Sequence, residues 1–395
     1  MRVARNPIKD RVAIVGVGST GFSRSNERSA LALALDASTQ AIRDAGLTAA
    51  DVNGIVAIGE PGAPSPQVLA ASLGISDVTY FSRPAPVVMF SIVDAMNAVY
   101  AGACDTVLVC AAMLRLPWAS RSAANDPFRR VLVRGGGGGA RGGWPESVAQ
   151  AAAYAAWASR YLHEYRATRE PFGRIAVNCR TNARANPLAA MRDPITMDDY
   201  YEARMIREPL CMLDMDVPVD GGDAFVLTTA ERARALQQPP VLVHATTVGL
   251  IDRNDEDQLP GLTRHGQHVV VEALRAKSDL WLDDVDVYYP YDGFTIITIG
   301  WLENTGWCAP GGAARFIADN WDDETGRLMI DGRIPVNTHG GSLSEGGTRG
   351  TGHIREAVVQ LRGQAGTRQV PGAKTALVTP GGFFFNSQGA ILRAA

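Results

Sequence analysis

The chain has 395 residues, of which 46% are hydrophobic and 20% are charged, so it is long enough for two domains or one large duplicated domain. Its formal net charge of −3 leaves no basic excess to neutralise phosphates, which argues against nucleic acid as a main partner. The first residues, MRVARNPIKDRVAIVGVG, enter a short glycine-broken apolar run that fits neither a signal peptide nor a membrane span. We therefore expect a cytoplasmic protein without a membrane segment.

The cysteines are scattered along the chain, without a CxxC pair or a histidine at zinc-ligand spacing. This pattern predicts buried free thiols and no metal site. The five residues are Cys104, Cys110, Cys179, Cys211 and Cys308.

The first elements of the chain predict a β-α-β unit. Val12–Val17 is a short apolar run typical of a buried strand, and Ala30–Gly46 has alanine and leucine at helical spacing. Between them, Gly16–Gly21 matches the dinucleotide pattern GxGxxG, but the polar stretch Ser23–Arg28 separates its third glycine from the helix. We therefore interpret Gly16–Gly21 as a strand end and a turn, and Asp51–Val56 as a turn into the second strand.

The same order of elements occurs twice. In the first half, the β-α-β unit is followed by a predicted helix, Ser91–Gly102, and a strand, Thr106–Val109. In the second half, strands and helices follow in the matching order, at Val241–Thr247, Val269–Lys277, Asp284–Tyr289, Ile354–Gly363 and Thr375–Thr379. The chain is therefore interpreted as duplicated, and strands this apolar predict parallel or mixed sheets with helices on both faces.

The segment between the halves, from about residue 113 to 216, differs in kind. It contains a glycine tract, Gly135–Gly139, which lacks the lysine-serine ending of a phosphate-binding loop and is flanked by arginines at 130, 134 and 141. A helix is predicted over Ser147–Tyr165. We interpret the segment as an insertion over the first half. After a strand at Ala224–Thr228 and a helix at Ala230–Leu236, Gln237–Pro240 is the boundary between halves 1–236 and 237–395.

The stretch Pro335–His353, PVNTHGGSLSEGGTRGTGH, is a glycine-rich loop that leads into the helix predicted at Ile354–Gly363. Its 6 glycines in 19 residues allow sharp turns and close approach of backbone to a ligand. Such a loop is either a binding surface or a packing corner, and the choice depends on what the rest of the chain brings to it.

Several stretches, in order along nearly the whole chain, carry a family resemblance: VAIVGVGSTGF, AVYAGACDTVLV, NPLAAMRDPITMDDYYEARMIREPLCMLDMDVPVDGGDAFVLTTAERA, YYPYDGFT, LENTGWCAPGG, PVNTHGGSLSEGG and EAVVQLRGQAG. They resemble the thiolase superfamily, in its branch of sterol-carrier-protein-type thiolases and lipid-transfer proteins. The resemblance implies an α/β fold, a five-layer α/β/α/β/α sandwich of two duplicated halves, assembled as a homodimer. It also implies an acyl-CoA or related thioester substrate, and no cofactor other than the coenzyme A of that substrate.

The residues that carry thiolase chemistry are replaced in this sequence. The place of the nucleophilic cysteine falls near Ala85, and the histidine that polarises the thioester is replaced by Gly347. The second cysteine corresponds to about Thr379, and the asparagine of the N-E-A-F motif to Tyr291. Because a covalent acyl-enzyme needs a thiolate, thiolysis by the usual route is excluded.

Within this branch, cysteine-less members that resemble this chain act as retro-aldolases on steroid side-chain CoA thioesters, paired with a small OB-fold, zinc-ribbon protein. They carry a tyrosine at the position of Tyr291 and a second one near Gly347, which this chain lacks. A retro-aldol cleavage needs a base and an enolate stabiliser but no covalent nucleophile. We therefore expect the space at Gly347 to hold a larger substrate beside Tyr291.

We predict Tyr291 as the acid/base, with His353, His339 and Glu345 as further catalytic candidates. Asp292 either orients Tyr291 or caps the following turn. His265 and His268 are predicted to be surface residues. The loop amides expected to stabilise the enolate oxygen are those of Gly340, Gly341, Gly346 and Gly347.

Three functions stay open from the sequence. The first is a carbon–carbon lyase acting on a bulky β-hydroxyacyl-CoA thioester such as a steroid side chain, in complex with an OB-fold partner. The second is a thiolase-like acyltransferase with an atypical nucleophile, for which Cys110 is the nearby thiol although its strand position indicates core. The third is a non-catalytic subunit that binds acyl-CoA or acts as a scaffold.

Overall fold

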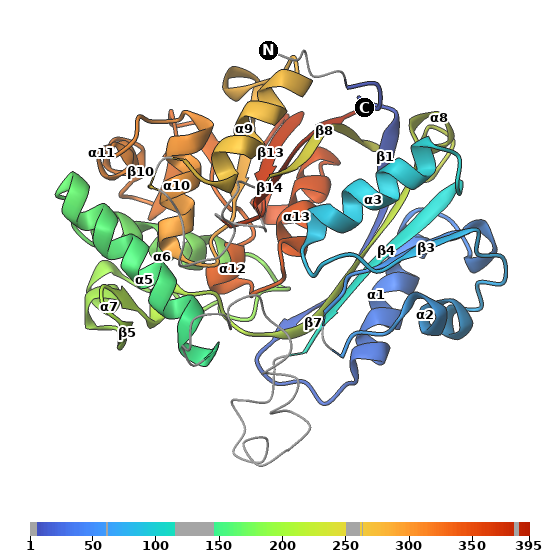
Figure 1. Ribbon diagram of the computed structural model, residues 1–395, viewed down its shortest axis with the longest axis horizontal. Coiled ribbons are helices and arrows are strands. Elements are labelled where there is room, and N and C mark those ends of the chain that lie inside the picture. The colour runs from blue at the N-terminus through green and yellow to red at the C-terminus, as the bar shows by residue number, and fades with distance from the viewer. Residues whose placement is uncertain (1–5, 61, 115–145, 250–260, 263, 383–386) are drawn as a thin grey trace.

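The computed structural model describes residues 6–395 except 61, 115–145, 250–260, 263 and 383–386 (Figure 1). Within these residues, nine strands form one mixed sheet in the order β3-β2-β4-β7-β1-β8-β14-β13-β9. The strands are β1 (Val12–Ser23), β2 (Gly54–Ala57), β3 (Tyr80–Ser82), β4 (Thr106–Met113), β7 (Asp220–Thr229), β8 (Val241–Gly249), β9 (Val287–Pro290), β13 (Thr375–Thr379) and β14 (Ser387–Ala394).

The strand order repeats between the two halves of this sheet. Outward from the middle, β1-β7-β4-β2-β3 and β8-β14-β13-β9 each place the first strand of the half beside its last one. A parallel bridge between Tyr288 and Val336 puts Val336 beside β9, as β3 lies beside β2. The half-sheets join through β1 and β8, where Ala13 pairs with Leu242 and Ile14 with Val241. The repeat of elements read from the sequence is thus also a repeat of topology.

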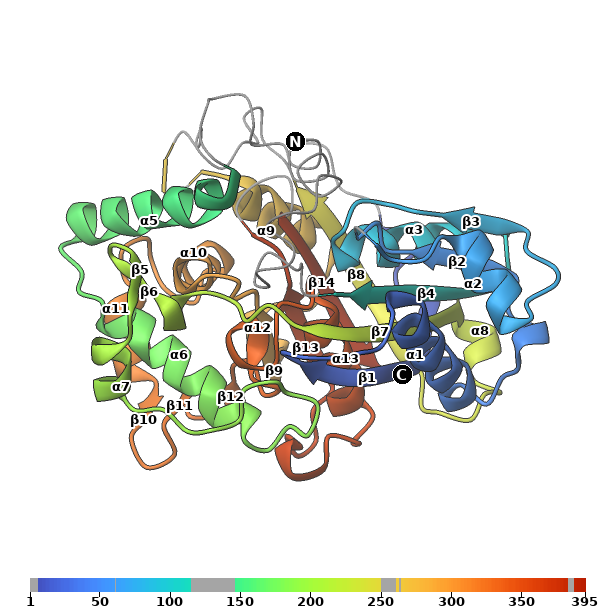
Figure 2. The same ribbon diagram turned by 90° about the horizontal axis from the view of Figure 1, so that it is seen from below.

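Helices cover the sheet in a layered arrangement (Figures 1 and 2). Helix α1 (Ala30–Asp44) packs on the outer face of the first half-sheet, in one hydrophobic cluster with β1, β4 and β7. Helices α3 (Val88–Tyr100) and α13 (Thr351–Leu361) share a second cluster with strands of both halves. Helix α9 (Gly266–Lys277) covers the outer face of the second half, within a third cluster. This is the predicted thiolase-like sandwich of helical and sheet layers.

The GxGxxG stretch lies entirely inside β1, so the predicted strand end and turn at Gly16–Gly21 is wrong. A Cβ on Gly16 would lie 2.1 Å from the carbonyl oxygen of Ala41, and one on Gly18 would lie 2.2 Å from that of Ala37. Because both carbonyls belong to α1, these glycines let the helix pack directly on the strand. Their role is packing rather than phosphate binding.

In the described residues, the two long helices of the segment between the halves pack on the second half and not on the first, contrary to the prediction. Helices α5 (Glu146–Tyr165) and α6 (Glu170–Ala183) lie beside α10 (Thr295–Thr305) and α11 (Ala313–Asp319) of the second half. They lie away from α1 and from α2 (Pro66–Leu73) (Figure 1). The glycine tract Gly135–Gly139 lies outside the described residues. The remaining helices and strands are α7 (Met197–Glu202), β5 (Met205–Arg207), β6 (Leu210–Cys211), α8 (Ala230–Ala233), β10 (Trp321–Asp322), β11 (Arg327–Ile330), β12 (Ile334–Pro335) and α12 (Gly341–Ser344).

The five thiols are unpaired, and four of them are buried while Cys308 is partly exposed. His268 is partly exposed, but His265 is buried, so its predicted surface position is wrong. Its ring accepts a hydrogen bond from the amide of Gln267 at the start of α9, and burial lowers its pKa to about 3. No helix in the described ranges is long and apolar enough to cross a membrane.

Candidate active site

Three segments meet at the glycine-rich loop. The turn after β9 carries Tyr291 and Asp292, the loop itself runs from residue 336 to 350, and residues 215–217 approach from the first half just before β7. The amide of Asp216 donates to the carbonyl of Gly293 (3.0 Å), that of Val217 to Ser342 (3.1 Å), and that of Gly347 back to Val217 (2.8 Å). Residues 215–217 are therefore fixed between the Tyr291 turn and the loop.

Asp292 holds the glycine-rich loop in place through hydrogen bonds and does not orient the Tyr291 side chain by one. Its carboxylate accepts hydrogen bonds from the amides of Ser342 (2.7 Å) and Leu343 (3.2 Å) in α12. It also lies 3.2 Å from Nε2 of His353 and accepts from the thiol of Cys179 at 3.3 Å. A Cβ on Gly341 would lie 1.9 Å from Oδ2 of Asp292, so only glycine at 341 leaves this space to the carboxylate. Asp292 caps neither Phe294 nor Thr295, whose hydroxyl donates to Asp214.

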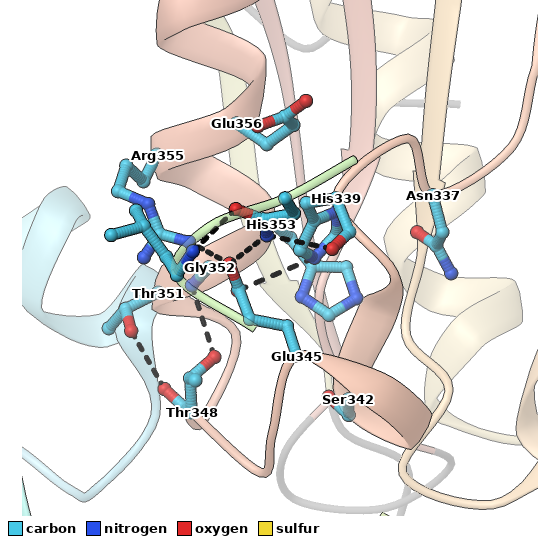
Figure 3. A network of polar contacts seen from close by, with 12 residues as sticks. Asn337, His339, Ser342, Glu345, Thr348, Thr351, Gly352, His353, Arg355 and Glu356 are labelled. Atoms are coloured by element: carbon cyan, nitrogen blue, oxygen red, sulfur yellow. Dashed lines mark hydrogen bonds and ion pairs between the residues drawn. The ribbon is translucent and has the colours of Figure 1, made fainter. Parts of the chain in front are cut away.

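Next to Asp292 begins a row of buried polar side chains, of which Figure 3 shows His353, His339, Glu345 and Arg355. The rings of His353 and His339 meet edge to face with centroids 4.7 Å apart, and Nε2 of His339 lies 4.0 Å from Oε2 of Glu345. Glu345 also accepts from the side-chain amide of Asn186 (2.7 Å). Asp292, His353, His339 and Glu345 are all 0% exposed.

Arg355 ends this row and ties the two halves together. One of its nitrogens binds both carboxylate oxygens of Asp223 on β7, at 2.7 and 3.0 Å, and another binds Glu345. Thr351 adds a hydrogen bond to Asp223 at 2.6 Å. We call Asp292, His353, His339, Glu345 and Arg355 the inner network.

Burial shifts the protonation of the inner network. It raises the pKa of Glu345 to about 7, although the guanidinium of Arg355 acts in the opposite direction. Burial also lowers the pKa of His339, and the neighbouring His353 and Arg355 add to that effect. His339 is therefore a neutral imidazole at neutral pH, and Glu345 exchanges its proton in the physiological range.

Tyr291 lies at the outer end of the site and is partly exposed. Its ring packs against His353 with centroids 5.9 Å apart. A Cβ on Gly293 would lie 2.7 Å from the phenol oxygen, so the ring folds back over that glycine. Burial, followed by the charge of Asp216, raises the pKa of Tyr291. The phenol therefore keeps its proton at neutral pH and acts as a hydrogen-bond donor.

Two charged residues beside Tyr291 were not predicted from the sequence. Asp216 is partly exposed, and its Oδ2 lies 2.7 Å from the place of a Cβ on Gly347. Arg349, with a side chain 45% exposed and a left-handed φ of 56° that is uncommon outside glycine, pairs with Glu60 of the first half. We call Tyr291, Asp216 and Arg349 the outer cluster. No motif in the sequence links these positions, although Asp216 lies in a stretch that carried the family resemblance.

The space beside Gly347 is filled by the Asp216 carboxylate, so the prediction that it is open for substrate is wrong at that point. The predicted oxyanion amides are also largely engaged. The amide of Gly340 donates to the carbonyl of Asn337 (2.9 Å), that of Gly346 to Gly341 (3.4 Å) and that of Gly347 to Val217 (2.8 Å). These three amides do not point to a ligand in this arrangement, whereas the role predicted for Gly341 stays a prediction.

The place predicted for the nucleophilic cysteine holds no alternative nucleophile. Ala85 is exposed before α3, and the first amides of that helix are occupied, since Val88 donates to the carbonyl of Arg349 and Met89 to the side chain of Gln388. Cys110 lies buried in β4, where burial raises its pKa to about 11. Its thiol is therefore protonated and enclosed, which is the opposite of what nucleophilic catalysis requires.

Known proteins resemble the chain along its whole length. A family model described as Thiolase C-terminal domain-like matches residues 252–394. The chain is 36% identical to a steroid side-chain-cleaving aldolase of Thermomonospora curvata, with 97% of each covered. It is 35% identical to a 17-hydroxy-3-oxo-4-pregnene-20-carboxyl-CoA lyase of Mycobacterium tuberculosis, covering 95% of this chain and 97% of the lyase.

Solved structures agree with this relationship. The structure of an Ltp2-ChsH2(DUF35) aldolase superposes with a TM-score of 0.84 at 34% identity, covering 98% of both chains. An Acat5 thiolase from Ascaris suum in complex with coenzyme A shares the fold at a TM-score of 0.66 and 15% identity, covering 98% of this chain and 100% of the thiolase. The chain therefore belongs to the thiolase superfamily, in the branch that contains the steroid side-chain-cleaving aldolases.

Proposed function

We propose that this protein is a carbon–carbon lyase that cleaves a bulky β-hydroxyacyl-CoA thioester, such as a steroid side chain, by a retro-aldol reaction. The observation that carries the proposal is the full-length similarity to two lyases of this kind. The site supports it, because a thiolase fold without a thiolate nucleophile still offers Tyr291 as a proton donor. The reaction is redox-neutral and needs no cofactor beyond the coenzyme A of the substrate.

In this reaction the β-hydroxyl loses a proton, the bond between the α and β carbons breaks, and its electrons form a thioester enolate. Tyr291 donates a hydrogen bond to the developing negative charge, for which its protonated phenol is suited. Four of the predicted catalytic and substrate-binding residues are fully buried and cannot contact the substrate, so they support the residues that do: Asp292, His353, His339 and Glu345. Asp292 holds the loop through Ser342 and Leu343. His353 in turn contacts Asp292, and Glu345 binds Arg355.

We further propose a complex with a small OB-fold, zinc-ribbon partner and a homodimer of this chain. The similar solved aldolase is described as Ltp2-ChsH2(DUF35), and a second protein named beside Ltp2 supports a partner of that class. For the homodimer, β3 is the last strand at one end of the sheet in the described residues, and its Phe81 is 56% exposed. An exposed apolar edge strand favours pairing with another chain. The five free thiols fit a reducing cytoplasm.

The alternatives are less well supported. An acyltransferase needs a reactive nucleophile, and Cys110 is buried and protonated. A scaffold subunit has no need for a partly exposed phenol and carboxylate at the centre of the fold, and the related lyases are enzymes by name.

The test is cleavage of 17-hydroxy-3-oxo-4-pregnene-20-carboxyl-CoA by the purified protein, alone and with a copurified partner, compared with Tyr291→Phe. We expect cleavage by the wild type and a loss in kcat of about 100-fold or more in the variant, since removal of one enolate-type donor has that effect. The matched control is Tyr201→Phe, which changes an exposed tyrosine of α7. Absence of cleavage of any β-hydroxyacyl-CoA in the presence of the partner would favour the scaffold function.

A further inference from the structure

The reaction needs a base, and the described residues near Tyr291 offer few groups that can reach a substrate. The inner network is enclosed, whereas Tyr291, Gly347 and Asp216 keep some exposure and Arg349 is exposed. Of these, Arg349 is a cation and Tyr291 keeps its proton. Asp216 is therefore the accessible group of the outer cluster that is able to accept a proton.

The backbone at Asp216 is fixed by hydrogen bonds, while the carboxylate itself accepts none from the described residues. The amide of Asp216 donates a hydrogen bond to the carbonyl of Gly293. The next residue, Val217, donates one to Ser342 and accepts one from Gly347. In the described part of the chain, no donor is hydrogen-bonded to the Asp216 carboxylate, in contrast to Asp292, whose two oxygens accept from Ser342 and Leu343. A positioned carboxylate with free lone pairs is suited to accept a hydroxyl proton.

Gly347 makes this placement possible. Any side chain at 347 would begin 2.7 Å from Oδ2 and 3.2 Å from Cγ of Asp216, closer than ordinary contact. The position therefore admits the carboxylate because it has no side chain of its own. A histidine at 347 and the carboxylate of Asp216 in its present place would compete for the same space.

The charges around Asp216 suit a base that works near neutral pH. Burial raises its pKa to about 6, the positive charge of Arg349 lowers it, and the negative charge of Asp292 raises it. Arg349 also interacts electrostatically with Tyr291 and Glu60. A base is most effective when it is ionised at the working pH yet still basic, and a carboxyl group in this range meets both conditions.

We propose that Asp216 is the general base of the retro-aldol step, a catalytic role that rests on the proposed function. Its carboxylate takes the proton of the β-hydroxyl, the oxygen becomes a carbonyl, and the bond between the α and β carbons breaks. The electron pair of that bond forms the thioester enolate, which Tyr291 and the positive charge of Arg349 stabilise. The protonated Asp216 then returns its proton to the α carbon, so the shortened acyl-CoA and the ketone leave with the enzyme unchanged.

The test compares Asp216→Asn, Asp216→Glu and the exposed control Asp198→Asn, using the same CoA thioester and the protein with its copurified partner. We expect Asp216→Asn to lower kcat by about 100-fold or more with KM changed less than about threefold, as for loss of a general base. The fall of wild-type kcat/KM below about pH 6 disappears in that variant, because the group that becomes protonated is gone. Asp216→Glu restores part of the rate, and Asp198→Asn matches the wild type.

A second variant guards against misfolding. Gly347→Ala keeps the acid but pushes it from its place, so we expect a fall in kcat with an unfolding midpoint close to that of the wild type. An Asp216→Asn enzyme that retains kcat within about threefold, or retains the acidic limb, would overturn the assignment while leaving the lyase function intact. A wild type that cleaves no β-hydroxyacyl-CoA would overturn both.

Discussion

The inner network and the outer cluster lie side by side, but they differ in exposure and in how the protein uses their polar atoms. Asp292, Glu345 and Arg355 are enclosed and bound to protein partners, because a buried charge without a partner is costly. The outer cluster is partly exposed, and the carboxylate of Asp216 has no donor among the described residues. The inner network therefore holds the site together, whereas the outer cluster is able to contact a substrate. Stability and activity should therefore respond to different substitutions.

The largest effect on stability is expected from Arg355→Met. The change removes the cation between Asp223 and Glu345 and leaves two buried carboxylates, one from each half, without it. Breaking a buried ion pair in this way costs about 3–5 kcal/mol, which chemical denaturation would measure. The control is Arg315→Met, in which an 89% exposed arginine loses an i,i+4 pair with Asp319 and the expected change is below about 0.5 kcal/mol. A change in unfolding free energy as small as that of the control would contradict the structural role assigned to the inner network.

A smaller effect, dependent on pH, is expected from Glu345→Gln. Because burial raises the pKa of Glu345 from 4.5 to about 7, the folded wild type retains a proton that the unfolded chain releases. This contribution to stability is fully present below pH 4.5 and is lost as the pH rises to about 7. The variant lacks this titration, so relative to the wild type its unfolding free energy should rise by roughly 3 kcal/mol between about pH 4.5 and 8.

Denaturation curves at several pH values check this, with the exposed Glu324→Gln as the control. Parallel pH profiles for the wild type and Glu345→Gln would mean that Glu345 is already ionised beside Arg355. The inner network would then be a permanent ion pair rather than a group that titrates.

The smallest effect on stability is expected from Gly293→Ala, which acts on the outer cluster. The added methyl group would lie 2.7 Å from the phenol oxygen of Tyr291, so the ring has to move. We expect kcat to fall by about 10-fold or more because a misplaced donor no longer meets the enolate, while stability changes by less than about 1 kcal/mol. Gly261→Ala, at a glycine with open space around it, is the control. Unchanged kcat would indicate that Tyr291 does not act from this position.

Much of the fold could be predicted because its signals are local. Apolar runs and helical spacing indicated the repeated strands and helices, and the structure confirms the repeat in its strand order. The short β3 and α2 were not predicted, since neither has a long periodic pattern. The side on which α5 and α6 pack was predicted wrongly, because that side depends on contacts with α10 and α11 that no local pattern specifies.

The site was predictable only in part, for the same reason. The glycine-rich loop was identified from its glycine content and Tyr291 by resemblance to a family, and both belong to the second half of the chain. Asp216 was missed because it comes from the other half of the chain and reaches the site through the backbone bonds that residues 216 and 217 make to Gly293 and Gly347. Exposure also had to come from the structure, because nothing in the sequence separates the buried Asp292 from the partly exposed Asp216.

The close approach of Asp216 to Gly347 also couples the residues that these two positions can hold. A histidine introduced at 347 would begin with a Cβ 2.7 Å from Oδ2 of Asp216, so the carboxylate would have to leave its present place. A larger residue at 347 therefore calls for a smaller one at 216, and a redesign of this site has to change the two positions as a pair.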